Sequence, residues 1–180
     1  MAKYPLLPAE EESRLLDIHI QENFIERVFA YHRLNNLFNN GYSRKRIIEF
    51  HTVSKYQILS HSQKHYTELG RMVASIKQFT PAQFKKSYCR LYMEAMKIKA
   101  TVKKIVNVLQ HILGFLKDNL NSEDKKYILR VIDVYRKNRA PLIVPITILR
   151  LFITKFNVSY IASQIYLNPH PRELMLKNHS

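Results

Sequence analysis

The chain has 180 residues, of which 29 are basic and 14 acidic, so its formal net charge is +15, and it contains only three glycines and one cysteine. So few glycines argue against the Gly-rich phosphate loops of common nucleotide enzymes, which need glycine at positive φ or where the backbone approaches a ligand. A single thiol excludes an internal disulfide and thiolate clusters for zinc or iron–sulfur, and no apolar run has signal-peptide or membrane-spanning length. We therefore expect a cytoplasmic protein with no membrane association and one main domain.

Apolar spacing of three to four residues predicts helices almost throughout the chain. The first expected helix carries Leu15 to Phe38 and stops at residues 39–41, where Gly41 follows two asparagines. A second helix is expected to begin after Ser43, a residue type that caps helix N-termini.

The clearest pattern follows Pro81. Thr80 and Gln83 flank this proline with the spacing of a capping box. Apolar residues then recur at helical spacing, which predicts one long amphipathic helix reaching about Asp118, long enough to kink. Its expected core face comprises Phe84, Tyr88, Leu91, Ala95, Ile98, Val102, Ile105, Leu109 and Leu113. On its opposite side, four cations form a predicted basic stripe: Lys86, Arg90, Lys97 and Lys104.

Three shorter helices are expected in the remaining chain. One begins at Ser122, the next has Pro145 in its first turn, and a last one holds Tyr160 before an extended elbow at residues 168–171. No segment has the pattern of a strand, so the sequence predicts an all-α single bundle of about six or seven helices, one of them long and amphipathic.

The positive charge is concentrated in one region. Residues 43–104 carry 14 basic and 3 acidic side chains, with tyrosines and histidines interleaved. Cations neutralise phosphates, and aromatic rings stack on bases, so this composition favours nucleic-acid binding. The residues predicted to bind it are Lys55, Lys64, Arg71, Lys86, Arg90, Lys97, Lys99 and Lys104.

Three polar clusters form a second set of candidates, as a pocket or as a structural hydrogen-bond network. They comprise His51, Tyr56, His61, Ser62, His65 and Tyr66; then Thr101, Asn107, Gln110 and His111; and finally Gln164, Tyr166, Asn168, His170, Arg172, Asn178 and His179.

Metal binding and catalysis have weaker support in the sequence. His61, His65 and Glu68 share a helical face with metal-ligand spacing, but neighbouring Lys64 and Arg71 disfavour a divalent cation. Ser62 lacks a nucleophile elbow, and the basic region has too few acids for a carboxylate pair. We therefore expect no metal, no cofactor and no catalytic residue.

Several runs resemble the bacterial YbgA-like domain of unknown function. They are Phe50-His51 with Lys55-Tyr56, residues 61–71 (HSQKHYTELGR), 99–114 (KATVKKIVNVLQHILG), 141–147 (PLIVPIT) and 166–179 (YLNPHPRELMLKNH). The resemblance divides the chain into an N-terminal segment with the start of the first helix, residues 1–26, and a YbgA-like helical domain, residues 27–180.

The resemblance also implies a role. Domains of this family occur alone or fused to a thiouracil-desulfidase-type domain, whose iron–sulfur cluster serves removal of sulfur from thiouridine in RNA. The helical domain is then expected to bind RNA, above all tRNA. One cysteine cannot ligate such a cluster, so desulfidase activity does not carry over to this chain.

The leading hypothesis is thus a module that binds structured RNA such as tRNA through a basic helical face, alone or beside a separate enzyme acting on the same nucleic acid. One alternative is a small-molecule or nucleotide enzyme with a pocket of histidine, asparagine and lysine side chains. Another is a DNA-binding accessory protein linked to repair. The sequence leaves the oligomeric state open.

Overall fold

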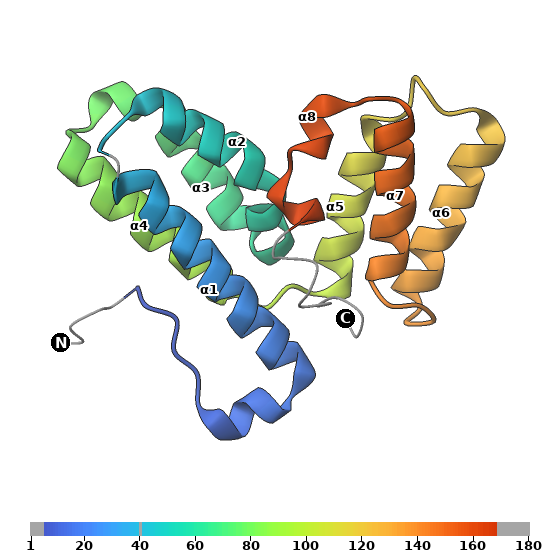
Figure 1. The fold of residues 1–180 in the computed structure, drawn as a ribbon, viewed down its shortest axis with the longest axis horizontal. Coiled ribbons are helices and arrows are strands. Elements are labelled where there is room, and N and C mark those ends of the chain that lie inside the picture. The colour runs from blue at the N-terminus through green and yellow to red at the C-terminus, as the bar shows by residue number, and fades with distance from the viewer. Residues whose placement is uncertain (1–5, 40, 169–180) are drawn as a thin grey trace.

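The computed structural model describes residues 6–39 and 41–168, and every regular element in these residues is helical (Figure 1). What we call the N-terminal lobe consists of α1 (Ile18–Asn39), α2 (Arg44–His61), α3 (Gln63–Ala74) and α4 (Pro81–Lys97). The C-terminal lobe consists of α5 (Val102–Gly114), α6 (Ser122–Arg136), α7 (Ile143–Lys155) and α8 (Ser159–Ala162). Three short 3₁₀ helices complete the described elements: Glu12–Leu16, Ile76–Gln78 and Ile165–Leu167.

The all-α class is confirmed, and local sequence signals mark several helix ends. The Ser43 side chain accepts a hydrogen bond from the Arg46 N–H at the start of α2. Thr80 and Gln83 form the expected capping box at the start of α4, where each satisfies a backbone N–H that has no partner within the helix. After α1, Gly41 adopts a φ of 80°, a conformation that glycine reaches without steric cost.

The predicted long helix is divided in two. α4 ends at Lys97, Ile98 is extended with φ −78° and ψ 120°, and α5 begins after Thr101, whose side chain accepts the Lys104 N–H. We call residues 98–101 the interlobe linker. The break is stable because the linker carbonyls of Ile98 and Lys99 receive hydrogen bonds from His61 and Lys104 in place of helical N–H groups.

Because of this break, not every residue of the expected core face is buried. Ile98, predicted to face inward, is 37% exposed, whereas Phe84, Tyr88, Ile105 and Leu109 are buried as predicted. The basic stripe is divided with the helix, because Lys104 belongs to α5 and the other three cations to α4.

α2 connects two hydrophobic cores. Its residues Ile47 and Ile58 are buried in the N-terminal core, which contains the stacked rings of Phe84, Tyr88 and Tyr92 on α4. Further along the same helix, Tyr56 and Leu59 are buried in the C-terminal core together with α5, α6 and α7. Because α2 contributes to both cores, the two lobes are joined by packing as well as by the linker.

None of the helices in the described residues is long and apolar enough to cross a bilayer.

Gly70 offers a direct test of local packing in α3. A Cβ built at this position meets no atom closer than His51 Nε2, at 3.9 Å, which is ordinary van der Waals contact. We expect Gly70→Ala to raise the free energy of unfolding by about 0.5–1 kcal/mol, because glycine loses more backbone entropy in a helix than alanine. Urea denaturation measures this change. Gly41→Ala should do the opposite because its φ is positive, and a destabilising Gly70→Ala would contradict the packing described.

Candidate nucleic-acid interface

An aromatic–lysine cluster lies where α2, α5 and α8 meet. We define it as Lys55 and Tyr56 on α2, His111 and Phe115 at the end of α5, and Tyr160 on α8. The Lys55 ammonium lies 4.9 Å from the Tyr56 ring centroid and 5.0 Å from that of Tyr160. The Tyr56 centroid is 6.4 Å from His111 and 6.5 Å from Phe115, while those of Phe115 and Tyr160 are 5.5 Å apart. The five side chains therefore form one continuous group.

Part of the cluster faces solvent. Phe115 is 42% exposed and Tyr160 is 39% exposed, and His111 is also exposed, whereas Tyr56 is buried beneath them. Burial of the Lys55 ammonium tends to lower its pKa, but the Tyr160 hydroxyl and neighbouring tyrosines outweigh this and raise the pKa above its usual value. Lys55 is accordingly charged at neutral pH, and the cation is held between aromatic rings.

The polypeptide after α8 is fixed to α2 by one buried side chain. Gln164 Nε2 donates a hydrogen bond to the Thr52 carbonyl, 3.1 Å away, and the side chain is almost fully buried. The 3₁₀ helix Ile165–Leu167 packs on α2 directly afterwards. This attachment places α8, and with it Tyr160, beside α2 and α5 (Figure 1).

The exposed face of α5 leads into the cluster. Lys103, Asn107, Gln110 and His111 are all exposed and follow one another at helical spacing. Their ammonium, amide and imidazole groups can donate hydrogen bonds to phosphates or base edges. Asn107, Gln110 and His111, all predicted candidates, thus share a surface with the exposed rings of the cluster, Phe115 and Tyr160.

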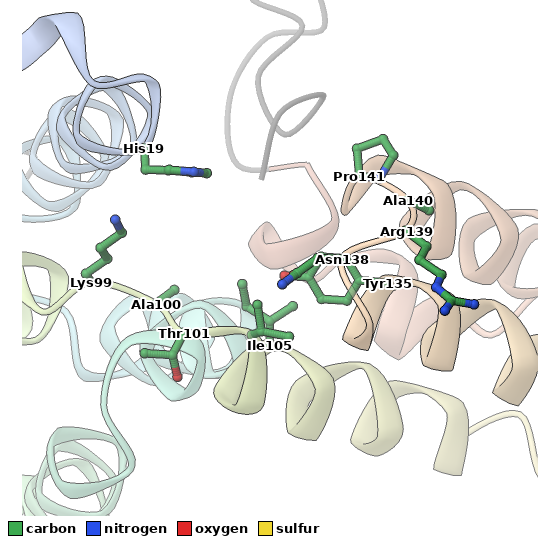
Figure 2. Close-up of a pocket in the computed structure, with 11 residues that line it drawn as sticks. His19, Lys99, Ala100, Thr101, Ile105, Tyr135, Asn138, Arg139, Ala140 and Pro141 are labelled. Atoms are coloured by element: carbon green, nitrogen blue, oxygen red, sulfur yellow. The ribbon is translucent and has the colours of Figure 1, made fainter.

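A separate cleft lies between the lobes, beside the interlobe linker (Figure 2). Its volume is about 770 Å³. The lining residues come from the start of α1, the linker, the first turn of α5 and the end of α6 with the turn after it: His19, Lys99, Ala100, Thr101, Val102, Ile105, Tyr135, Asn138, Arg139, Ala140 and Pro141. Of the predicted binding residues, Lys99 and Thr101 line it.

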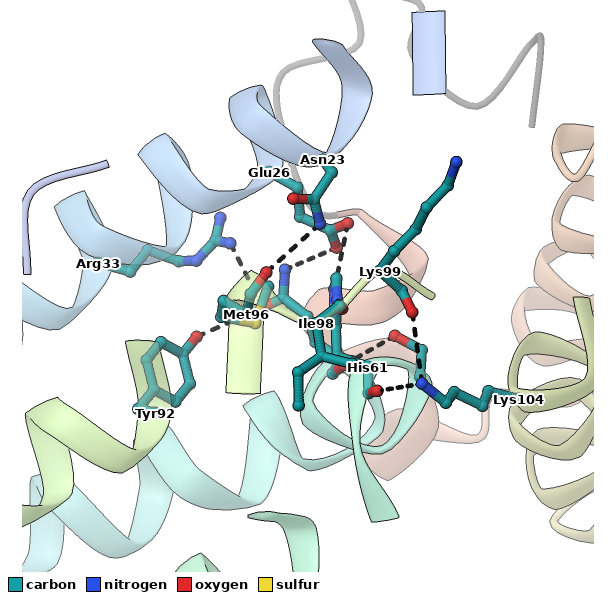
Figure 3. Close-up of polar contacts among 11 residues, drawn as sticks. Asn23, Glu26, Arg33, His61, Tyr92, Met96, Ile98, Lys99 and Lys104 are labelled. Carbon is teal, nitrogen blue, oxygen red and sulfur yellow. Dashed lines mark hydrogen bonds and ion pairs between the residues drawn. The ribbon is translucent and has the colours of Figure 1, made fainter. Parts of the chain in front are cut away.

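His61 joins the two lobes from a buried position (Figure 3). Its side chain is only 1% exposed, and Nδ1 lies 2.6 Å from the Ile98 carbonyl, which can only accept a hydrogen bond, so Nδ1 donates. Nε2 lies 3.4 Å from a Glu26 carboxylate oxygen on α1. The Lys104 ammonium donates to the His61 carbonyl at 2.7 Å and to that of Lys99 at 3.3 Å. These contacts hold α1, α2, the linker and α5 together.

The network continues into the N-terminal lobe. The other carboxylate oxygen of Glu26 accepts a hydrogen bond from Gln57 Nε2 at 2.9 Å, and the Tyr92 hydroxyl donates to Gln57 Oε1 at 3.4 Å. Asn23 Nδ2 donates to the Met96 carbonyl at 3.3 Å (Figure 3). The last turn of α4 is therefore tied to α1 just before the linker begins.

The other histidines lie in different surroundings. His51 Nδ1 is 3.2 Å from the Tyr88 hydroxyl, and burial, reinforced by the nearby Lys55 charge, lowers the pKa of His51 to about 4. His65 Nδ1 is 2.8 Å from the Ser62 hydroxyl, and His111 lies against Tyr56. The four candidate histidines, His51, His61, His65 and His111, therefore have four different sets of partners.

Several other candidates have structural roles. Ser62 caps α3 by accepting the His65 N–H, Thr101 caps α5, and Tyr166 is buried in the C-terminal core. Tyr66 is partly buried against both cores. The exposed candidates are Lys64, Arg71, Lys86, Arg90, Lys97, Lys99, Thr101, Asn107, Gln110, His111 and Asn168. The predicted residues His170, Arg172, Asn178 and His179, like the elbow after Asn168, lie outside the described residues.

Within residues 6–39 and 41–168, no group of three or more histidine, cysteine or acidic side chains could hold a metal ion. Cys89 is buried, and burial raises the pKa of its thiol to about 11, so it is a packing residue at neutral pH.

Phe115 and Tyr160 were not among the sequence candidates. Phe115 is four residues after His111 and so lies one turn further along the same face. Helical spacing could therefore have identified it as a candidate. Nothing in the local sequence of Tyr160 indicates its partners, because they lie on α2 and α5.

Fold and surface together define an all-α protein whose two lobes share a central helix and carry an exposed cation–aromatic cluster. The chain belongs to the DUF1722 family, described as a protein family of unknown function, whose sequence profile matches residues 55–171. It is also similar to the uncharacterized protein YbgA of Escherichia coli strain K12, with 27% identity over 153 residues that cover 84% of this chain and 90% of that protein. No solved structure matches the chain. The matched region contains all five residues of the aromatic–lysine cluster.

Proposed function

We propose that this protein binds structured RNA, with tRNA as the first candidate, and that the aromatic–lysine cluster is where unpaired bases stack. The observation that carries the proposal is the pair of half-exposed rings, Phe115 and Tyr160, which pack on each other while the charged Lys55 ammonium lies 5.0 Å from the Tyr160 ring centroid. Aromatic rings that serve only packing are normally buried in a core. Phe115 and Tyr160 are instead partly exposed to solvent, next to a cation.

The chemistry of this surface suits RNA loops. Specific RNA recognition targets unpaired bases, which stack on aromatic side chains, and each stacked base contributes about 1–3 kcal/mol as judged by alanine substitution. Lys55 and, one helix away, Lys103 supply positive charge for the phosphates next to such bases. Asn107 and Gln110 supply amides that can pair with base edges.

The remaining charge supports general attraction to a polyanion. Exposed cations on α3 and α4, among them Lys64, Arg71, Lys86 and Arg90, add to the field of the +15 chain. Lys104 contributes less than its place in the predicted stripe suggested, because its ammonium donates to two backbone carbonyls.

Binding of tRNA across a salt series, followed by fluorescence anisotropy, tests the proposal. We expect steep salt dependence, with a slope of log K against log salt of about −0.7 to −0.9 for each phosphate contact. Phe115→Ala and Tyr160→Ala should each weaken binding about tenfold without changing that slope, because stacking is lost and charge is not. Tyr127→Ala on α6 is the matched control, since Tyr127 is 47% exposed and lies outside the cluster.

Three results would contradict the proposal or part of it. Absence of tRNA binding at low salt, or a flat salt dependence, would exclude RNA binding as the function. Equal losses in Phe115→Ala and Tyr127→Ala would exclude the cluster as its site. Equal competition by duplex DNA would favour the DNA-binding alternative, because B-form grooves present no unpaired bases for stacking.

A further inference from the structure

The cleft beside the interlobe linker has no role in the RNA proposal. Its described lining contains basic and uncharged side chains. His19 on α1 and Lys99 on the linker line one side of the cleft, and Arg139 lines the opposite side. Among the described residues that line the cleft, none is acidic. Such a lining favours an anion.

Two carboxylates lie near the cleft without lining it, and their negative charge opposes anion binding there. Asp17 lies near Lys99, but its carboxylate accepts the N–H groups of His19 at 2.8 Å and Ile20 at 3.2 Å, so it is engaged at the start of α1. Burial and, to a smaller extent, the Glu22 carboxylate raise the pKa of Tyr135, so Glu22 also lies near the cleft. These charges lower the affinity for an anion without removing the cationic character of the lining.

The floor of the cleft is apolar. Val102 and Ile105 on α5 and the ring of Tyr135 on α6 form this floor, whereas Pro141 lines the cleft further away, beside Ala140 (Figure 2). A volume of about 770 Å³ lies in the range of small-molecule sites, and an inorganic anion would fill only a small part of it. The floor therefore fits a ligand that joins an apolar ring system to its anionic group.

The side chains are arranged to hold the two halves of such a ligand. In Figure 2, the His19 ring and the Asn138 amide point into the space between the lobes, with Lys99 on the same side as His19. Asn138 is held at a positive φ of 54° in the turn after α6, and its amide can both donate and accept hydrogen bonds. The Arg139 guanidinium points away from the centre of the cleft.

We propose that this cleft binds a small organic phosphate of nucleotide size, with its ring against Val102, Ile105 and Tyr135 and its phosphate near Lys99 and His19. Asn138 then faces the polar edge of the ring. The site is distinct from the aromatic–lysine cluster and does not depend on RNA binding. Its ligand is a free nucleotide or a single unpaired nucleotide of a longer chain, because both present the same ring and phosphate.

Calorimetric titration of the full chain with adenosine 5′-monophosphate, adenosine and inorganic phosphate tests the proposal. We expect the nucleotide to bind at least about tenfold more tightly than either half, because only it uses the floor and the cations together. Lys99→Ala should weaken nucleotide binding about tenfold, and Arg139→Ala should weaken it less. Lys125→Ala is the matched control, an exposed lysine on α6 that belongs neither to the cleft lining nor to the proposed RNA-binding surface.

Binding of phosphate as tight as that of the nucleotide would overturn the proposal, since the apolar floor would then contribute nothing. Equal losses in Lys99→Ala and Lys125→Ala would overturn it too, because the effect would then come from net charge. Competition distinguishes the two sources of ligand. Displacement of the nucleotide by a single-stranded oligonucleotide, with both weakened by Lys99→Ala, identifies an unpaired nucleotide, and lack of displacement identifies a free one.

Discussion

Replacing His61 with alanine should lower the free energy of unfolding by about 3 kcal/mol or more. The imidazole is 1% exposed and its Nδ1 donates to the Ile98 carbonyl, so its removal leaves this buried acceptor without its donor next to a cavity. An acceptor that stays buried without its donor loses solvation that it does not regain in the folded state. Urea denaturation of the two proteins measures the difference.

His65→Ala provides the matched control for this prediction. His65 is only partly buried, on the first turn of α3, and its ring contacts the Ser62 hydroxyl at 2.8 Å. We expect its loss to cost about 1 kcal/mol or less, as for a single partly exposed hydrogen bond. Similar costs for the two substitutions would show that the junction at His61 does not contribute to stability as described.

The second large effect is a loss of stability in mild acid that depends on His51. Its pKa is lowered from 6.5 to about 4, first by burial and then by the Lys55 charge. Between these two pH values, His51 binds a proton in the unfolded chain but not in the folded protein. The free energy of unfolding is therefore unaffected by His51 above about pH 6.5 and decreases as the pH falls towards 4. The full loss over this window is about 2–3 kcal/mol.

Urea denaturation at several pH values between 7.5 and 4 measures this loss. His51→Gln keeps a polar side chain near the Tyr88 hydroxyl but cannot titrate, so we expect its stability to depend less steeply on pH over the same window. Histidine NMR titration gives an independent measurement. An imidazole of His51 that titrates near pH 6.5 in the folded protein, or equal pH dependence in the two proteins, would contradict the prediction.

The parts of the fold that followed from sequence are those controlled by neighbouring residues. Ser43 and Thr80 cap helices through hydrogen bonds to the third residue after them, so their role is visible within one turn of chain. Gly41 ends α1 for an equally local reason. The division of the long helix was not visible in this way, because the Ile98 and Lys99 carbonyls are satisfied by His61, about forty residues earlier, and by Lys104.

The candidate site shows the same contrast. Lys55, Tyr56 and His111 were candidates from the sequence because they stand in clusters of polar and aromatic residues, and composition placed the basic region at residues 43–104. Their convergence with Phe115 and Tyr160 depends on the packing of α5 and α8 against α2, which Gln164 secures through the Thr52 carbonyl.

By itself, the sequence determined the helical class, most helix boundaries and the location of the positive charge, because periodicity, capping and composition act over a few residues. Only the tertiary structure decided that Lys104 turns to backbone carbonyls, that His61 is buried at the lobe junction, and that Lys55 lies between two tyrosine rings. These outcomes depend on contacts between residues far apart in the chain, whose pairing is set by the packing of whole helices rather than by local pattern.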